Sequence, residues 1–135
     1  MTQRGFSLVE ALIALLVLSL GLVGVAAMQL KALQSASLGY QRSVASVAAV
    51  DAQERLWAQL ATLEASQTCA DINVDALEQA WANHWFQDND HAPLRNAVDS
   101  SIENGNDSCQ FTVTLALSDN ENASFDYTFR LPEVP

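Results

Sequence analysis

Basic residues are scarce in this chain, which has six lysines and arginines against sixteen aspartates and glutamates and a formal net charge of -10. Arg42, Arg55, Arg95 and Arg130 are isolated from one another. A nucleic-acid-binding surface needs clustered lysine and arginine to neutralise phosphates. The composition therefore argues against direct nucleic-acid binding, and the acidic residues beyond Asp51 predict a solvated surface.

Recognisable catalytic motifs are also missing. The chain has no glycine-rich phosphate loop, no G-x-S-x-G and no H-E-x-x-H. His84 and His91 stand near Asp88 and Asp90, but their spacing is looser than that of paired zinc ligands. A calcium loop would need a later glycine and glutamate. We therefore expect no enzyme activity, no metal and no cofactor, and we predict a solvated loop around these residues.

Charged residues are absent from Ala11 to Met28. As a helix this apolar run would be about 27 Å long, close to the roughly 30 Å of a bilayer core. A cleaved secretory signal is one interpretation, since Arg4 precedes the run and Val25 to Ala27 resembles a cleavage site. Glu10 argues against it, because a carboxylate near the start of an apolar span is costly to insert and serves no purpose in a discarded segment.

The helical pattern continues beyond the apolar run, with no proline and a single glycine between Met28 and Glu64. Apolar residues recur there at three- and four-residue steps: Leu30, Leu33, Val44, Val47, Ala48, Leu56, Leu60 and Leu63. We predict one helix from Phe6 to about Glu64, much longer than a bilayer is thick. Its small residues are expected to allow close approach of other helices, and Gly21 and Gly24 to give local flexibility.

The residues GFSLVEALIALLVLSLGLVGV, from Gly5 to Val25, resemble the N-terminus of a type IV prepilin. The shared features are a short charged leader, Gly-Phe at the cut, a glutamate five residues later and a long apolar helix. The resemblance implies cleavage by a prepilin peptidase between Gly5 and Phe6, and methylation of the new N-terminal amine of Phe6. Glu10 then becomes the fifth residue of the mature chain.

Several further expectations come with this resemblance. Glu10 would pair with the N-terminal amine of a neighbouring subunit. The alternative is that this carboxylate, which is close to the cut end, extends to the lipid headgroups. The stretch to about residue 34 resembles the PilV type of minor pilin, whereas a type II secretion pseudopilin has the same kind of leader and helix. A membrane-tethered periplasmic binding module that never polymerises is the competing class.

The implied organisation has four parts. Residues 1–5 form the leader, 6–29 the transmembrane and filament-core helix, 30–65 the amphipathic second half of the helix, and 66–135 a periplasmic head. The leader would lie in the cytoplasm, with a single pass through the inner membrane and a place in the pilus after assembly. Implied partners are other minor and major pilins, the prepilin peptidase and the assembly platform, in support of twitching motility, adhesion or DNA uptake.

The head is expected to give the chain an α+β, type IV pilin-like fold. Cys69 and Cys109 both fall in the exported part, so we expect one disulfide between them; two buried free thiols are the alternative. A helix is predicted after a cap at Asp71 or Asn73, with an apolar stripe that we expect to cover the long helix; a ligand platform formed by its two tryptophans is the alternative. This stripe consists of Val74, Leu77, Trp81 and Trp85.

The end of the chain predicts an antiparallel hairpin with one buried face. Phe111, Val113, Leu115 and Leu117 alternate with small and polar residues, and so do Phe125, Tyr127, Phe129 and Leu131. The intervening 118–122 segment is polar and predicts a turn. Val98, Ser100 and Ile102 also alternate, which suits a third strand, while Leu94, Val98 and Ile102 would suit a helix; the family resemblance favours the strand.

Overall fold

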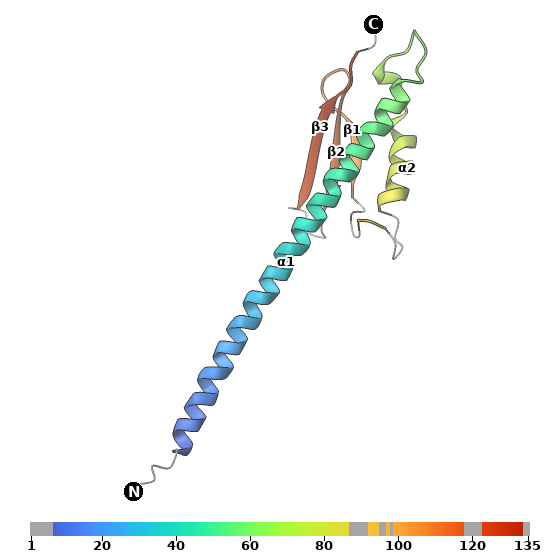
Figure 1. Ribbon diagram of the computed structural model, residues 1–135. Helices are drawn as coiled ribbons and strands as arrows, with labels where there is room; N and C mark the ends of the chain where they lie inside the picture. The colour runs from blue at the N-terminus through green and yellow to red at the C-terminus, as the bar shows by residue number, and fades with distance from the viewer. Residues whose placement is uncertain (1–6, 87–91, 95–96, 98, 118–122, 134–135) are drawn as a thin grey trace. The chain divides into compact units, whose positions relative to one another are not determined.

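The structure is a computed structural model that describes residues 7–86, 92–94, 97, 99–117 and 123–133. Its elements in chain order are α1 (Leu8–Leu60), the 3-10 helix η1 (Cys69–Asp71), α2 (Val74–Trp85), β1 (Ser101–Asn104), β2 (Gln110–Ala116) and β3 (Ser124–Arg130). The chain divides into two compact units, Met1–Leu38 and Gly39–Pro135. The long apolar helix and the small antiparallel sheet make an α+β, type IV pilin-like fold (Figure 1).

α1 is a single helix of 53 residues and passes through Gly21 and Gly24 without interruption. The sequence predicted an end near Glu64, but the helix ends four residues earlier. Its last turn tightens, since Thr62 N–H donates to Gln59 O at 3.0 Å and Leu63 N–H to Leu60 O at 3.3 Å. The Thr62 hydroxyl also donates to Gln59 O. This hydrogen bond satisfies a carbonyl group at the end of the helix. The predicted start at Phe6 lies outside the described residues.

In the second unit, α1 contributes a face of small residues to the core. The buried residues are Ala45, Ala48, Ala49, Ala52, Leu56 and Leu60. Alanine has almost no side chain beyond its Cβ, so other elements approach the helix backbone closely. Of the apolar residues that recur in the sequence, Ala48, Leu56 and Leu60 lie on this face, whereas Val47 is exposed.

The predicted hairpin is confirmed. β2 pairs antiparallel with β3, with Phe111 opposite Phe129, Val113 opposite Tyr127 and Leu115 opposite Phe125. On β2 these apolar residues are buried and alternate with half-exposed ones, whereas their partners on β3 are half-buried. The pattern shows that one face of the sheet covers the core. The polar turn predicted at 118–122 lies outside the described residues.

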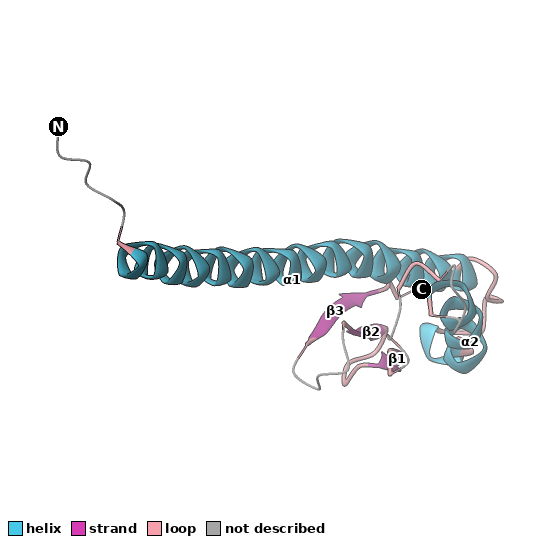
Figure 2. Cartoon of the chain, turned by 90° about the horizontal axis from the view of Figure 1, so that it is seen from below, coloured by secondary structure: helices cyan, strands magenta, loops and turns pink. Residues whose placement is uncertain are grey.

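A third strand extends the sheet in the order β1-β2-β3. β1 begins at Ser101, three residues later than the segment considered in the sequence, and Ile102 pairs with Val113. Ile102 is buried because it is on the same face of the sheet as its partner. Val98 lies outside the described residues. Figure 2 shows the three strands side by side.

α2 begins at the cap that the sequence predicted, because the Asn73 side chain accepts a hydrogen bond from Ala76 N–H at 3.1 Å. Asp71, the other candidate, is the last residue of η1, and its carboxylate accepts from the N–H of Thr68, the residue immediately before η1. α2 packs along the outer edge of β1, where the Glu78 carboxylate accepts from Ile102 N–H at 2.7 Å. This hydrogen bond satisfies a backbone N–H group that would otherwise be unpaired at that edge of the sheet.

A disulfide joins Cys69 to Cys109, in agreement with the expectation from the sequence. It connects η1, which follows the long helix, to the residue immediately before β2. Both cysteines are buried. The bridge closes a loop with a sequence separation of 40, which restricts the unfolded head more than the folded one.

We predict that replacing both cysteines, in the variant Cys69→Ser/Cys109→Ser, lowers the free energy of unfolding of the head by about 4 kcal/mol, from the loop-closure entropy. The measurement is urea unfolding of the full chain in detergent micelles, followed by tryptophan fluorescence. All three tryptophans lie in the second unit, so the signal reports on the head. Wild-type protein treated with a reductant is the control, and an unchanged midpoint in both samples would contradict a stabilising role for the bridge.

Candidate functional site

The first unit consists of an apolar helical segment with exposed side chains. From Leu8 to Met28 the helix carries leucine, isoleucine, valine, alanine and glycine with little else, and each of these residues is exposed. α1 is long and apolar enough to cross a membrane by length and composition. An exposed apolar surface of this extent requires lipid or other helices around it. The segment therefore has the properties of a membrane anchor.

Glu10 is the single charged residue between Leu8 and Leu30. It lies in the first turn of α1, where the partial positive charge of the helix N-terminus favours a carboxylate. The residue is exposed. An acid in this position is available to a group outside the chain, and the cost of inserting it into an apolar environment falls when a cation lies beside it. Gly5 and Phe6 lie outside the described residues.

Gly21 and Gly24 leave open space on the surface of this segment. Apart from the adjacent residues and the backbone of the helix itself, a Cβ atom added to either residue would meet no atom within 4 Å. Contacts within the protein therefore do not require glycine at these positions. Small residues on an apolar helix permit a second helix to approach closely. Contact with a helix of another molecule would therefore favour glycine at these positions.

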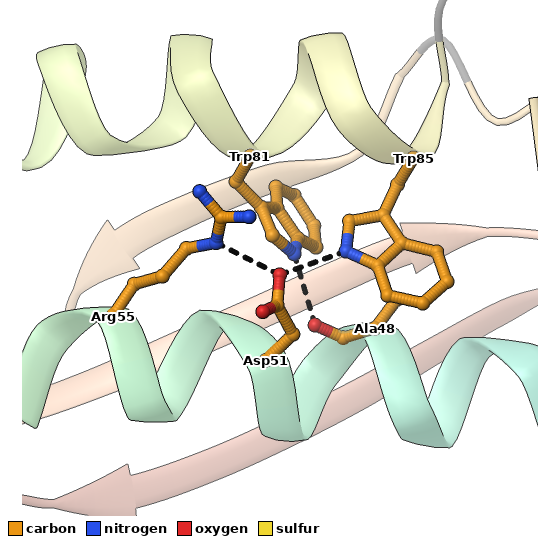
Figure 3. A network of polar contacts seen from close by, with 5 residues as sticks. All are labelled: Ala48, Asp51, Arg55, Trp81 and Trp85. Carbon is orange, nitrogen blue, oxygen red and sulfur yellow. Dashed lines mark hydrogen bonds and ion pairs between the residues drawn. The ribbon is translucent and has the colours of Figure 1, made fainter.

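The two tryptophans of α2, Trp81 and Trp85, are held against α1 by polar contacts (Figure 3). Trp81 is fully buried and its indole N–H donates to Ala48 O at 2.9 Å. The indole N–H of Trp85 donates to the Asp51 carboxylate, also at 2.9 Å. The prediction that this apolar stripe covers the long helix is therefore confirmed for Trp81 and Trp85. These two tryptophans serve the packing of the head and do not form an open platform for a ligand.

Asp51 is the shared acceptor in the contact between α1 and α2. Its carboxylate accepts from Trp85 and forms an ion pair with Arg55 one helical turn later, at 2.8 Å. Burial acts to raise the pKa of Asp51, but the hydrogen bonds from Trp85 and Arg55 and the charge of Arg55 outweigh it, with a smaller contribution from His84. The pKa is therefore lowered from its usual value of 3.8.

The Asp51 network was not anticipated from the sequence. A signal for it exists, because Asp51 is an acid that interrupts the small and apolar run from Val44 to Ala52 and has Arg55 four residues later. Its tryptophan partner lies 34 residues away in sequence, so spacing alone does not reveal the pair. Only the packing of α2 on α1 brings them together.

The histidine and aspartate group considered as a metal site is only partly within the described residues. His84 is in the last turn of α2, beside the Trp85 ring, while Asp88, Asp90 and His91 lie outside. Across the residues that the structure describes, no three metal-ligating side chains gather. The two cysteines are engaged in the disulfide.

Residues 1–26 match the family described as the prokaryotic N-terminal methylation motif. The match contains the Gly5–Phe6 pair and Glu10, and it ends within the apolar segment of α1. Neither a curated protein nor a solved structure matches the chain significantly. The motif, the apolar helix and the small sheet together support a type IV pilin-like structural protein.

The lowered pKa of Asp51 predicts how the head responds to acid. A carboxyl group whose pKa is lower in the folded state contributes stability that is present above its unfolded pKa, near 3.8 for Asp51, and is lost as the pH falls through the folded value. We expect Asp51→Asn to unfold more easily than wild type at pH 7, by about 1 kcal/mol because the side chain is partly solvated. The difference between the two proteins should shrink below about pH 4.

Urea unfolding of both proteins between pH 7 and pH 3 measures this difference. Trp85→Phe is the matched control, because it keeps an aromatic ring in place and removes the N–H donor to Asp51. A gap between wild type and Asp51→Asn that stays constant over the whole pH range would contradict the assigned network.

Proposed function

We propose that the chain is a minor pilin of a type IV pilus. The observation that carries the proposal is the methylation motif at residues 1–26, which continues directly into an exposed apolar helix with one acidic residue. A small disulfide-bonded head follows the same helix. In this proposal the protein is a structural component, and it is the substrate of an enzyme, the prepilin peptidase.

The four parts of the sequence take distinct roles in this proposal. Residues 1–5 are the leader, 6–29 span the membrane and later enter the filament core, 30–65 join this segment to the head, and 66–135 complete the head. The peptidase cuts between Gly5 and Phe6 and methylates the amine of Phe6. The leader faces the cytoplasm before cleavage, and the head is in the periplasm, where a disulfide is able to form.

Glu10 fixes the axial position of each helix relative to its neighbour in the assembly. In the filament its carboxylate pairs with the N-terminal amine of a neighbouring subunit. The apolar environment makes an unpaired carboxylate unfavourable, so a subunit that is displaced along the helix axis loses the pair and is rejected. The open surface at Gly21 and Gly24 supports this arrangement, since it lets a neighbouring helix come close.

The partners in this proposal are other minor and major pilins, the prepilin peptidase and the assembly platform of the inner membrane. A minor pilin would prime pilus assembly or join the tip complex, and thereby support twitching motility, adhesion or DNA uptake. Direct contact with nucleic acid is not part of the proposal, because the formal net charge of -10 opposes it.

Processing gives the first test. Intact-mass analysis of the protein from its native membrane should show a chain that begins at methylated Phe6, and a strain without the peptidase should retain Met1. The peptidase-deficient strain is the control for spontaneous loss of the leader. A chain that retains Met1 in the presence of the peptidase, or that begins near Met28, would favour a tethered module or a cleaved signal.

The charge of Glu10 gives the second test. Glu10→Val should remain in the membrane fraction, because it makes the span more apolar. Its amount in sheared pili, measured by immunoblot, should fall at least tenfold because the register contact is lost. Glu10→Asp keeps the charge and should retain part of the incorporation. Normal incorporation of Glu10→Val rules out the pairing role.

Co-purification from detergent extracts separates the pilus from the related secretion apparatus. If the partners of the processed chain are pseudopilins of a type II secretion system and include no pilins, the chain is a minor pseudopilin.

A further inference from the structure

The two edges of the three-stranded sheet differ in how their backbone groups are paired. The strand order is β1-β2-β3, so β1 and β3 are the edge strands. At the β1 edge the Glu78 carboxylate of α2 accepts from Ile102 N–H. No strand of the described residues lies beyond β3. The β3 edge is therefore the one at which the sheet is open.

The hydrogen bonds at the two ends of the β2–β3 ladder show which residues of β3 face outward. Leu117 N–H donates to Ala123 O, and Leu131 N–H donates to Cys109 O, both at 2.8 Å. In an antiparallel ladder every second residue exchanges such bonds with the neighbouring strand, and the residues between them direct N–H and C=O to the other side. No backbone group of the described residues pairs with these outward groups. They belong to the even-numbered residues of the strand, Asp126, Thr128 and Arg130.

β3 lacks the features that commonly protect an edge strand. Its pairing with β2 runs without a bulge from Ser124 to Arg130, and this segment contains neither proline nor lysine. The side chains on its core-facing side are aromatic and only half-buried: Phe125, Tyr127 and Phe129. A regular, aromatic edge of this kind is a template for a further strand.

The sequence of β3 is complementary to itself in the antiparallel direction. When two copies of the strand meet about a two-fold axis at Thr128, each Asp126 lies opposite Arg130 of the second copy. On the core-facing side, each Tyr127 lies opposite Phe129 of the second copy. Opposite charges and aromatic pairs on facing positions stabilise a sheet. In this register the outward backbone groups of each copy also find partners on the other.

Other antiparallel registers lose this match. An axis at Asp126 would place two carboxylates opposite each other, and an axis at Arg130 two guanidinium groups, which is unfavourable. An axis at Tyr127 would place Asp126 opposite Thr128 and Arg130 opposite Ser124, without a charge pair. The charges of the strand therefore favour the axis at Thr128.

Arg130 is accessible to a second carboxylate. It forms an ion pair with Asp107 at 2.8 Å, but its side chain is 56% exposed and that of Asp107 is 66% exposed. An exposed pair of this kind contributes little stability and exchanges readily. The guanidinium group also has five N–H donors, of which the bond to Asp107 uses one. The internal pair is therefore compatible with a contact to Asp126 of a second copy.

The antiparallel pairing separates this contact from packing within one filament. β3 runs in the same direction as residues 39–60 of α1, because its end is bonded to Cys109, which the disulfide joins to Cys69 beyond the end of α1 (Figure 1). In two copies joined at β3, these parts of α1 run in opposite directions. Neighbouring helices of one filament run in the same direction, so the contact joins copies that are not neighbours in a filament.

We infer that β3 is a self-association surface, at which the heads of two copies of this chain pair antiparallel about Thr128. The inference goes beyond the proposed function, since it depends on neither the methylation motif nor the apolar segment. Two short strands bury less area than a stable interface does, so the dimer is weak and reversible. The formal net charge of -10 on each copy opposes it at low ionic strength, whereas at about 0.15 M salt the screening length is about 8 Å.

Cysteine cross-linking of the full chain in detergent micelles, at about 0.15 M salt, tests the inference. Both native cysteines are in the disulfide, so one introduced cysteine is the reactive thiol. Thr128→Cys places two thiols beside the axis. Ser124→Cys is the matched control, exposed on the same strand, and its two thiols would be about 27 Å apart along the strands. A short bismaleimide reagent should join two copies at least tenfold more at position 128 than at position 124, as measured by denaturing electrophoresis.

Charge reversal gives a second readout. Asp126→Arg and Arg130→Asp, each combined with Thr128→Cys, should lower the cross-linked fraction about tenfold, because like charges then face each other. The two changes alter the net charge in opposite directions, so losses in both exclude net charge as the cause. The double variant Asp126→Arg/Arg130→Asp restores opposite charges and should recover most of the cross-linking. It also lacks the Asp107 pair, so its recovery separates the contact between copies from that internal pair.

The other outcomes overturn the inference. No cross-link at position 128 shows that the edge does not pair with a second copy, and equal yields at positions 124 and 128 show a non-specific encounter. A double variant that recovers no cross-linking contradicts the register about Thr128. None of these results affects the proposed function, because cleavage at Gly5 and incorporation into pili are measured separately. A chain that is not cleaved in its native membrane contradicts the proposed function and leaves the pairing of β3 intact.

Discussion

The close approach of Trp81 to the backbone of α1 is the contact on which the head depends. Alanine at positions 45, 48, 49 and 52 removes side-chain bulk from one side of the helix, so a buried indole reaches the carbonyl oxygen of Ala48. A larger residue on this face would move α2 outward. The position of β1 would change with it, because Glu78 on α2 holds the backbone of Ile102. The alanine face thus determines where both the second helix and the sheet edge lie.

Polar contacts make this packing specific without leaving a charge unpaired. Asp51 stands at the border of the alanine face, where it is solvated enough to remain ionised and close enough to receive Trp85 N–H and Arg55. Tyr127 makes a comparable contact from the sheet to Gln53. Apolar surfaces alone would allow α2 and the sheet to slide along the helix, whereas directional hydrogen bonds favour one arrangement. The disulfide then restrains the segment that connects the end of α1 to β2.

The two parts of α1 have different surfaces. Its first part is apolar on every side and carries one carboxylate, as expected of a segment that is surrounded by lipid or by other helices. Its second part is buried on one side and still apolar on the other, at Val47, Val50 and Trp57. Both surfaces are unsuited to an isolated protein in water. They are consistent with a pilin-like subunit that is completed by its neighbours.

The sequence by itself determined the elements whose signals are local. The uncharged run after Glu10, the Asn73 cap and the alternation from Phe111 to Leu131 each depend on neighbouring residues, so the long helix, α2 and the hairpin were predictable in kind. The tertiary structure decided which side of α1 is buried, the pairing of β1 with β2 and the partners of Asp51. The reason is physical: helical periodicity in α1 is compatible with two apolar faces, and only the elements packed against Ala48 and Ala52 distinguish the buried face from the exposed one at Val47 and Val50.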